Sequence, residues 1–330
     1  MKNKDKEVDL NVRLIPYIQN EEIRATTLSS PYGINMIQAK SFWNTSQKGE
    51  GINIAIIDSG CDIEHINLKD NIVGVRNFTD EDNKNPNVVV DRVGHGTHVT
   101  GIIAANGENG IVGVAPKANI YVLKAINRSG TGKLSWVINA INYAVEKKVD
   151  IISMSLGMSA NNEKLERAVK EAVNKNILVV CAAGNEGNGN AEDFQYSYPA
   201  AYVDVISVGA VDKRGNPAYF SNANLVIDVV APGVEILSTY PNNSYASLSG
   251  TSMATPYVSG SLALLKNWSK EEFQRDLTEE ELYAQLIKHT KTLNYSRAVQ
   301  GNGLIYLKEE KAIKKNKILK KWTYLKIYLF

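Results

Sequence analysis

Four short motifs carry side chains that together could perform acyl-transfer chemistry. Asp58 ends the aliphatic run NIAIID, His95 lies in VGHGTHV, Asn185 in AAGNEG and Ser252 in GTSMATP. A serine hydroxyl becomes a nucleophile when a histidine removes its proton, and the resulting imidazolium is stabilised by a carboxylate. A side-chain amide can donate a hydrogen bond to the oxyanion that then forms. These residue types therefore predict nucleophilic catalysis by a Ser–His–Asp group.

Each of these residues, taken alone, also has a plain structural interpretation. Asp58 could begin a turn, Asn185 could be a loop asparagine and Ser252 could cap a helix. The pair formed by His95 and His98 could bind a metal ion, but the sequence offers no third ligand nearby and no HExxH pattern. His98 is therefore expected either to pack against the helix that His95 begins or to support the catalytic groups from behind. Only the occurrence of all four motifs in one chain favours catalysis over these alternatives.

The elements that must position these residues follow from hydrophobic spacing. After the run that ends at Asp58, short aliphatic runs recur at 119–125, 149–156, 177–183, 205–211 and 225–231. Amphipathic stretches with helical spacing lie between them at 134–148 and 162–175, and an apolar helical stretch follows at 253–265. The alternation predicts an α/β fold with a mostly parallel sheet covered by helices on both faces. Ligands bind at the carboxyl ends of such strands, and both Asp58 and Asn185 are placed at strand ends.

Composition limits the class of protein. The chain has 330 residues, 44% of them hydrophobic and 22% charged, which is typical of a globular protein that buries a sizeable core. No apolar run approaches the roughly 18–20 residues of a membrane span. The formal charge of +2 argues against nucleic-acid binding. Cys61 and Cys181 are too few for a disulfide framework, and the polar N-terminus does not resemble a secretory signal, so a cytoplasmic location is predicted.

The order Asp, His, Ser and the surrounding motifs resemble the subtilisin family of serine proteases. The stretches RLIPY, IISMSLG, VVCAAGNEG and SYPAAY resemble its intracellular branch, the intracellular subtilisins, over most of the chain. The resemblance implies a subtilisin-like three-layer αβα fold and a serine endopeptidase of broad specificity. It assigns Ser252 as the nucleophile, His95 as general base and then acid, and Asp58 as the group that orients His95. The side chain of Asn185 and the backbone N–H of Ser252 would form the oxyanion hole.

The resemblance also implies two backbone edges that bind an extended substrate. The edge residues are Gly130, Thr131 and Gly132 on one side and Ser155, Leu156 and Gly157 on the other. Pairing through main-chain groups discriminates little between side chains, which agrees with broad specificity. Gly157 and Gly184 are expected to leave room for a large side chain in the first pocket. Glu186 is expected to favour basic residues there.

The residues Leu14, Ile15, Pro16 and Tyr17 resemble the inhibitory segment of the intracellular branch. Such a segment could dock in the active-site groove as an added strand. Because proline has no N–H and a fixed φ, it would end the pairing and lift the next peptide bond away from the nucleophile. The alternative is a mobile apolar N-terminus. The predicted organisation is an inhibitory extension over 1–28, a catalytic domain over 29–307 and a basic, aromatic tail over 308–330.

No cofactor is expected for the chemistry, and a structural calcium or sodium ion is left open. Asn67 stands where relatives have an aspartate ligand, and the loop 106–112 is one residue shorter than in relatives that bind calcium tightly. Both differences argue against a tight calcium site. A weaker cation site could use the backbone carbonyls of Ala200, Tyr202 and Val205, because hard cations accept such oxygens.

The tail differs in charge from the rest of the chain. Residues 308–330 contain eight lysines and two glutamates, a net charge of +6, which leaves −4 for the other 307 residues of a chain that carries +2. The tail could contact an acidic partner, a membrane surface or RNA, or it could be solvated. Expected partners are protein and peptide substrates, with no nucleic acid, and the resemblance implies a homodimer. The alternatives to a general protease are a peptide-binding pseudoenzyme and a dedicated processing peptidase for one peptide precursor.

Overall fold

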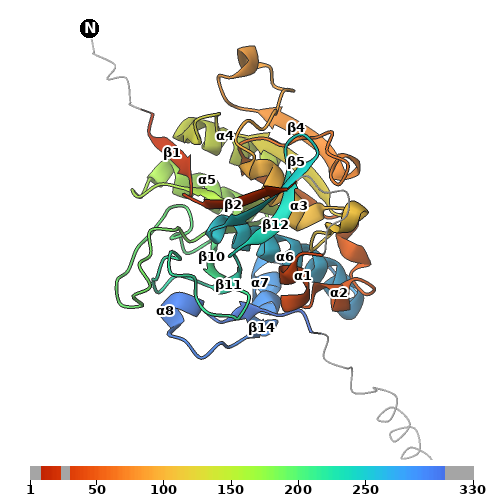
Figure 1. The fold of residues 1–330 in the computed structure, drawn as a ribbon, viewed down its shortest axis with the longest axis vertical. Helices are drawn as coiled ribbons and strands as arrows, with labels where there is room; N and C mark the ends of the chain where they lie inside the picture. Colours follow the sequence, from red (N-terminus) through yellow and green to blue (C-terminus); the bar gives the residue numbers. More distant parts are fainter. Residues whose placement is uncertain (1–8, 24–29, 309–330) are drawn as a thin grey trace, which may run out of the picture.

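A large, mostly parallel sheet forms the centre of the protein in a computed structural model that describes residues 9–23 and 30–308 (Figure 1). In spatial order its strands are β14 (Thr290–Lys291), β15 (Leu304–Ile305), β11 (Val229–Pro232), β10 (Ile206–Val211), β9 (Leu178–Ala182), β7 (Ile151–Met154), β3 (Asn53–Asp58), β5 (Asn119–Lys124) and β4 (Ile72–Asn77). Neighbouring strands are parallel except β14 and β15. The carboxyl ends of β3 and β9 consequently lie at the same edge.

Helices cover both faces of this sheet. The two helical layers contain α3 (His95–Ala104) and α6 (Thr251–Phe273) on one face, and α4 (Leu134–Glu146) and α5 (Glu163–Asn174) on the other. Side chains of β3 alternate between the faces. Ile54 and Ile56 belong to the apolar cluster that contains residues of α3 and α6, whereas Ala55 and Ile57 belong to the cluster with α4 and α5. The predicted three-layer αβα fold is therefore confirmed.

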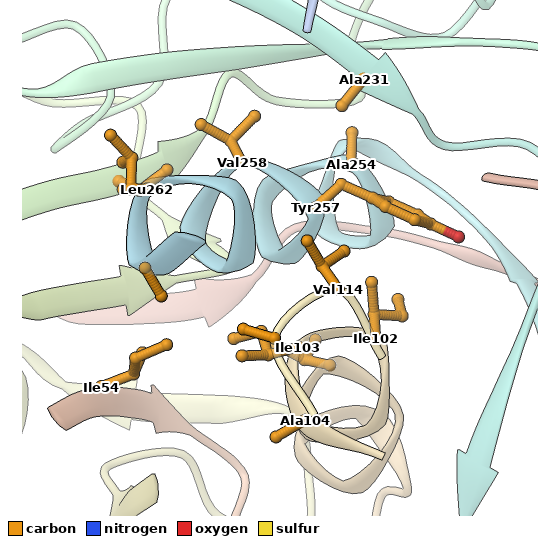
Figure 2. Packing of buried hydrophobic residues seen from close by; sticks show 14 of the residues in the cluster. Ile54, Ile102, Ile103, Ala104, Val114, Ala231, Ala254, Tyr257, Val258 and Leu262 are labelled. Carbon is orange, nitrogen blue, oxygen red and sulfur yellow. The ribbon is translucent and has the colours of Figure 1, made fainter. Parts of the chain in front are cut away.

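Helix α6 is buried throughout its first half, from Thr251 to Leu265. Its residues Ala254 and Val258 point away from α3, and Ala254 points toward Ala231 of β11 (Figure 2). Tyr257 on the same helix is 1% exposed, and a Cβ added to Gly33 would lie 2.2 Å from its hydroxyl oxygen. This apolar environment holds the first turn of α6, and Ser252 within it, in one place.

Two small sheets and several short helices complete the fold. The small sheets are β6 (Thr131–Lys133), β1 (Asn11–Leu14) and β8 (Leu156–Gly157), and β12 (Ile236–Tyr240), β13 (Ser244–Ser249) and β2 (Ile18–Ile23). The short helices are α1 (Tyr32–Met36), α2 (Ala39–Phe42), α7 (Glu279–Lys288) and α8 (Arg297–Gln300), with 3₁₀ turns at Gln47–Gly49, Lys69–Asn71, Asp82–Lys84 and Glu108–Gly110. Among the described residues, no helix is both long and apolar enough to cross a membrane.

Two predicted boundaries differ from the structure by more than two residues. The strand expected at 225–231 begins only at Val229, because Leu225 is 60% exposed and the side chain of Asn224 accepts the N–H of Val226 in a turn. Helix α6 continues past the expected end at 265 to Phe273, since its last two turns lie partly outside the core and need no apolar face.

Candidate active site

Asp58 and His95 meet where a strand ends and a helix begins. Asp58 is the last residue of β3 and His95 the first of α3. Nδ1 of His95 lies 2.8 Å from Oδ1 and 3.0 Å from Oδ2 of Asp58, and both side chains are buried. A carboxylate at Nδ1 fixes the tautomer in which Nε2 carries the free lone pair of a base. Nε2 has no hydrogen-bond partner among the described residues.

Glycines let the helix start pack directly against the strand end. A Cβ on Gly96 would lie 2.1 Å from the carbonyl oxygen of Gly60. Gly94, which precedes His95, has a φ of 90°, a left-handed conformation that favours glycine. The glycines on both sides of His95 therefore allow the start of α3 to approach the end of β3 closely.

Ser252 is the second residue of α6 and is fully buried. Its hydroxyl lies 3.5 Å from the carbonyl oxygen of Ser155, and the described hydrogen bonds include none from it to His95. The ring of Tyr17 lies beside the imidazole instead, with 4.9 Å between the ring centroids. Burial raises the pKa of the Tyr17 phenol above its ordinary value, so the neutral ring covers the histidine.

The side-chain amide of Asn185 points into the same space. Its Oδ1 accepts hydrogen bonds from the backbone N–H of Thr251 at 2.9 Å and from the Thr251 hydroxyl at 2.8 Å. The amide nitrogen is thereby turned toward the cleft, where it donates to the carbonyl oxygen of Pro16 at 2.5 Å. Thr251 was not predicted as a functional residue, although it stands directly before Ser252 in GTSMATP.

Strand β1 lies between the two edges expected to hold substrate, as the red strand in Figure 1. It pairs antiparallel with β6 and with β8. The Cα partners are Val12 with Gly132, Arg13 with Thr131 and with Gly157, and Leu14 with Leu156. The N–H of Leu14 donates to the carbonyl of Gly130 at 3.0 Å, and that of Ile15 reaches the Ser155 carbonyl at 3.5 Å. Residues 11–15 thus occupy both edges.

The pairing changes at Pro16. After it the chain turns away from β6 and β8 and forms β2, which pairs antiparallel with β13 in a second small sheet. The pair nearest Pro16 is Ile18 with Ser249, three residues before Ser252. The N-terminal segment therefore runs through the whole cleft, with Pro16 and Tyr17 over the catalytic candidates.

The first pocket contains the side chain of Ile15, which is 1% exposed. A Cβ on Gly157 would lie 2.8 Å from Cδ1 of Ile15, and Gly184 has a φ of 112°. A cavity of about 70 Å³ remains beside Ile15 and is bordered by Glu186. One oxygen of the Glu186 carboxylate lies 3.4 Å from the guanidinium of Arg13.

The side-chain amide of Asn67 bridges the loop 106–112, where relatives would hold a tight calcium ion. Nδ2 of Asn67 donates to Oδ1 of Asn106 at 2.9 Å and to the carbonyl of Glu108 at 2.7 Å, and Oδ1 of Asn67 accepts the hydroxyl of Tyr245 at 2.8 Å. Hydrogen-bond donors, the Asn67 amide and the Tyr245 hydroxyl, occupy the oxygens that a cation would need, so these residues do not fit calcium. Among the described residues no three His, Cys, Asp or Glu side chains form a metal-binding group. The carbonyl site at Ala200, Tyr202 and Val205 stays a prediction.

The two cysteines are free and buried. Burial raises the pKa of the Cys61 thiol and of the Cys181 thiol above their ordinary values. A thiol that stays protonated is a poor nucleophile. Their environment therefore agrees with structural roles.

A buried histidine held by a carboxylate and a buried serine in the first turn of a helix, on a three-layer αβα fold, are features of a serine hydrolase. Residues 49–304 match the subtilase family, so the chain belongs to the subtilases and is a serine endopeptidase of the subtilisin type. Catalysis in this family needs no cofactor.

The chain is 51% identical over 298 residues to the "Major intracellular serine protease" of Bacillus subtilis (strain 168), covering 90% of this chain and 93% of that protein. It is 50% identical over 302 residues to the "Intracellular serine protease" of Paenibacillus polymyxa, covering 91% and 92%. It is 42% identical over 236 residues to "Subtilisin DY" of Bacillus licheniformis, covering 71% and 84%.

Proposed function

We propose that the protein is an intracellular endopeptidase of broad specificity that uses Ser252, His95, Asp58 and Asn185. The observation that carries the proposal is the buried contact of 2.8 Å between His95 and Asp58, which leaves Nε2 of the histidine free. In the proposed reaction Ser252 Oγ attacks the scissile carbonyl carbon while its proton moves to Nε2 of His95. Asp58 stabilises the imidazolium through Nδ1.

The oxyanion of the tetrahedral intermediate would be held by Nδ2 of Asn185 and the backbone N–H of Ser252. The Asn185 amide is already fixed by Thr251 and already binds a carbonyl oxygen, that of Pro16. His95 then gives the proton to the leaving amine, which releases the first product and leaves an acyl-enzyme. Water attacks the ester with the same base, and proton return to Ser252 completes the cycle.

Substrate is proposed to take the place of β1 between the two edges. Because those contacts are main-chain hydrogen bonds, many side chains are accepted. The contact of Arg13 with Glu186 supports a preference for basic residues near the first pocket. Cleavage profiling of Glu186→Gln tests this preference, and a profile identical to the wild type would argue against it.

Residues 1–28 are proposed to form an inhibitory extension whose removal activates the catalytic domain at 29–307. The pairing of β1 with both edges and the position of Tyr17 on His95 support this proposal. The carbonyl bound by Asn185 belongs to Pro16, whereas the residue paired with Ser155 is Ile15. In a productive substrate a single residue would make both contacts. The extension would thus be shifted by one residue from the position of a productive substrate.

A cytoplasmic location is proposed from the two free cysteines and from the word "intracellular" in the names of the similar proteins. A homodimer is also proposed. The tail at 308–330 lies largely outside the described residues, and its contact with an acidic partner or membrane surface stays a prediction. A processing peptidase for one precursor is the alternative, and cleavage of many proteins in a cell extract would exclude it.

The chemistry is tested with Ser252→Ala beside a control, Cys61→Ala, which removes the buried thiol three residues after Asp58. Wild type and Cys61→Ala should react with a fluorophosphonate and cleave casein, whereas Ser252→Ala should do neither, because only the Ser252 hydroxyl is activated. Undiminished casein cleavage by Ser252→Ala would refute the assignment. Mass spectrometry of the same samples reports self-processing and its site.

The inhibitory role is tested by comparing the full chain in the Ser252→Ala background with a Ser252→Ala form that begins near Leu28. Neither form can process itself. A peptide substrate should bind only the truncated form, because β1 blocks both edges of the full chain. Equal binding by the two forms would contradict the proposal.

A further inference from the structure

Asp91 is a buried carboxylate on the loop that leads to the catalytic helix. It stands four residues before the histidine and is 5% exposed. Its Oδ1 accepts the Ser59 hydroxyl at 2.9 Å and the backbone N–H groups of Gly94 at 2.8 Å and Val93 at 3.1 Å. Its Oδ2 accepts the N–H of Thr97 at 2.8 Å and the Thr97 hydroxyl at 2.7 Å. Five donors therefore satisfy one ionised group at the start of α3.

Ser59 connects this carboxylate to the strand that carries Asp58. The Ser59 hydroxyl donates to Asp91 and accepts the backbone N–H of Gly96 at 3.0 Å. The backbone N–H of Ser59 donates to Oδ1 of Asp58 at 2.7 Å. Its carbonyl accepts the buried ammonium of Lys124 at 2.6 Å. Hydrogen bonds thus fix Ser59 through its backbone N–H, its hydroxyl and its carbonyl oxygen.

We propose that Asp91 and Ser59 are positioning residues that hold the end of β3 and the start of α3 in the register that the Asp58–His95 contact needs. The inference rests on the proposed function. Asp58 and His95 are on different elements, so their geometry depends on what fixes one element to the other. The Asp91–Ser59–Gly96 link spans this junction directly. When the supporting groups no longer hold a catalytic pair in place, the catalytic rate falls even though the fold is intact.

The ionised form of Asp91 is needed because all five partners donate. An asparagine would offer one carbonyl oxygen and one NH₂ group, and the NH₂ group would face donors. Asp91→Asn therefore disturbs the whole junction. Ser59→Ala is the milder change, because it removes only the bridging hydroxyl and keeps the other four bonds to Asp91.

The test compares Ser59→Ala and Asp91→Asn with Ser261→Ala, a control that removes another fully buried hydroxyl, bonded to the Tyr257 carbonyl at 2.8 Å. Full-length variants are left to process themselves, active sites are counted with a fluorophosphonate, and kcat and KM are measured on a peptide p-nitroanilide. Ser59→Ala should lower kcat by about tenfold with KM changed by less than about twofold, since alignment and not binding is affected. Asp91→Asn should lower kcat further, and Ser261→Ala should leave it unchanged.

A second readout does not depend on processing. In the Ser252→Ala background, the proton between His95 Nδ1 and Asp58 should give a downfield NMR signal that shifts or broadens in Ser59→Ala but not in Ser261→Ala. The proposal would be overturned if Ser59→Ala had the same kcat and the same proton signal as the control. It would also be overturned if Ser59→Ala changed only KM. If Ser252→Ala itself stays active, the proposed function fails whatever the Ser59 variants do.

Discussion

At the scale of single residues, His98 and His95 differ in environment although three positions separate them on one helix. Nε2 of His98 contacts the carbonyl oxygens of Ile236 at 2.9 Å and Ala246 at 3.0 Å, so it carries the proton and donates to both. Complete burial lowers the pKa of His98 to about 3. The His98 ring thus packs from α3 against β12 and β13.

The lowered pKa of His98 predicts acid sensitivity of the fold. Between pH 6.5 and about 3 the unfolded chain binds a proton that native His98 does not, so the free energy of unfolding falls as the pH falls through this window. From pH 7 to pH 4 the loss from this group should be on the order of 3 kcal/mol. Urea unfolding should show a smaller difference between these pH values for His98→Gln than for wild type. Equal differences would contradict the prediction.

The Asn67 side chain gives a second prediction for a single residue, which concerns calcium binding at its loop. Asn67→Asp puts a carboxylate against the Asn106 amide oxygen and the Glu108 carbonyl, which should cost about 1–3 kcal/mol without metal. Calcium should restore the melting temperature of this variant, while wild type should respond to neither calcium nor EDTA at this loop. Asn267→Asp is the matched control, because Asn267 also donates to two carbonyls, those of Ser46 and Glu50. Calcium that fails to stabilise Asn67→Asp, or that stabilises both variants equally, would refute the prediction.

At the scale of elements, one short strand determines what the cleft can bind. Strand β1 has only four residues, yet it pairs with neighbours on both sides. Most side chains of β2 are exposed, so main-chain pairing with β13 holds that strand. The proline between the two strands separates these pairings, because it supplies no N–H.

Replacing Pro16 should therefore change how fast the extension is cut. Pro16→Ala restores an N–H and relaxes φ, which lets the chain continue in register and brings a peptide bond closer to Ser252. Self-processing in a time course followed by mass spectrometry should be several-fold faster than in wild type. Leu10→Ala, upstream of β1, serves as the control and should process at the wild-type rate. Unchanged or slower processing of Pro16→Ala would argue that proline does not protect the extension.

At the scale of the whole molecule, the last contacts of the described fold lie just before the tail. Strand β15 joins the central sheet, and the N–H of buried Leu307 donates to the carbonyl of Ile37 at 2.7 Å. The body carries −4 and the tail +6. These positions suggest that the catalytic body needs no contact from the last twenty residues.

Deleting residues 311–330 should leave the melting temperature of the Ser252→Ala chain within about 2 °C, because the described residues up to 308 already form a core and a complete central sheet among themselves. A fall of more than about 5 °C would show that the tail contributes to the fold. Sedimentation with anionic vesicles is measured on the same pair. Binding by the full chain alone would support the tail contact predicted from its charge.

Much of the site could be predicted from local pattern. Aliphatic runs and turn residues placed Asp58 at a strand end, and the spacing after His95 placed that residue at a helix start. These features depend on neighbours within a few positions, which a sequence displays directly. The boundary of β11 was wrong because Leu225 looks like a strand residue until its exposure is known.

The sequence by itself thus determined the fold class, the family and the residue types of the proposed chemistry. The tertiary structure alone decided that Thr251 orients the Asn185 amide, that Asn67 closes the loop at Glu108 and that Ser59 joins Asp91 to Asp58. These contacts join positions that are far apart along the chain, and the side chains involved are common in turns and loops. Their function depends on the direction of one hydrogen bond, which the packing of the elements sets and the local sequence pattern does not contain.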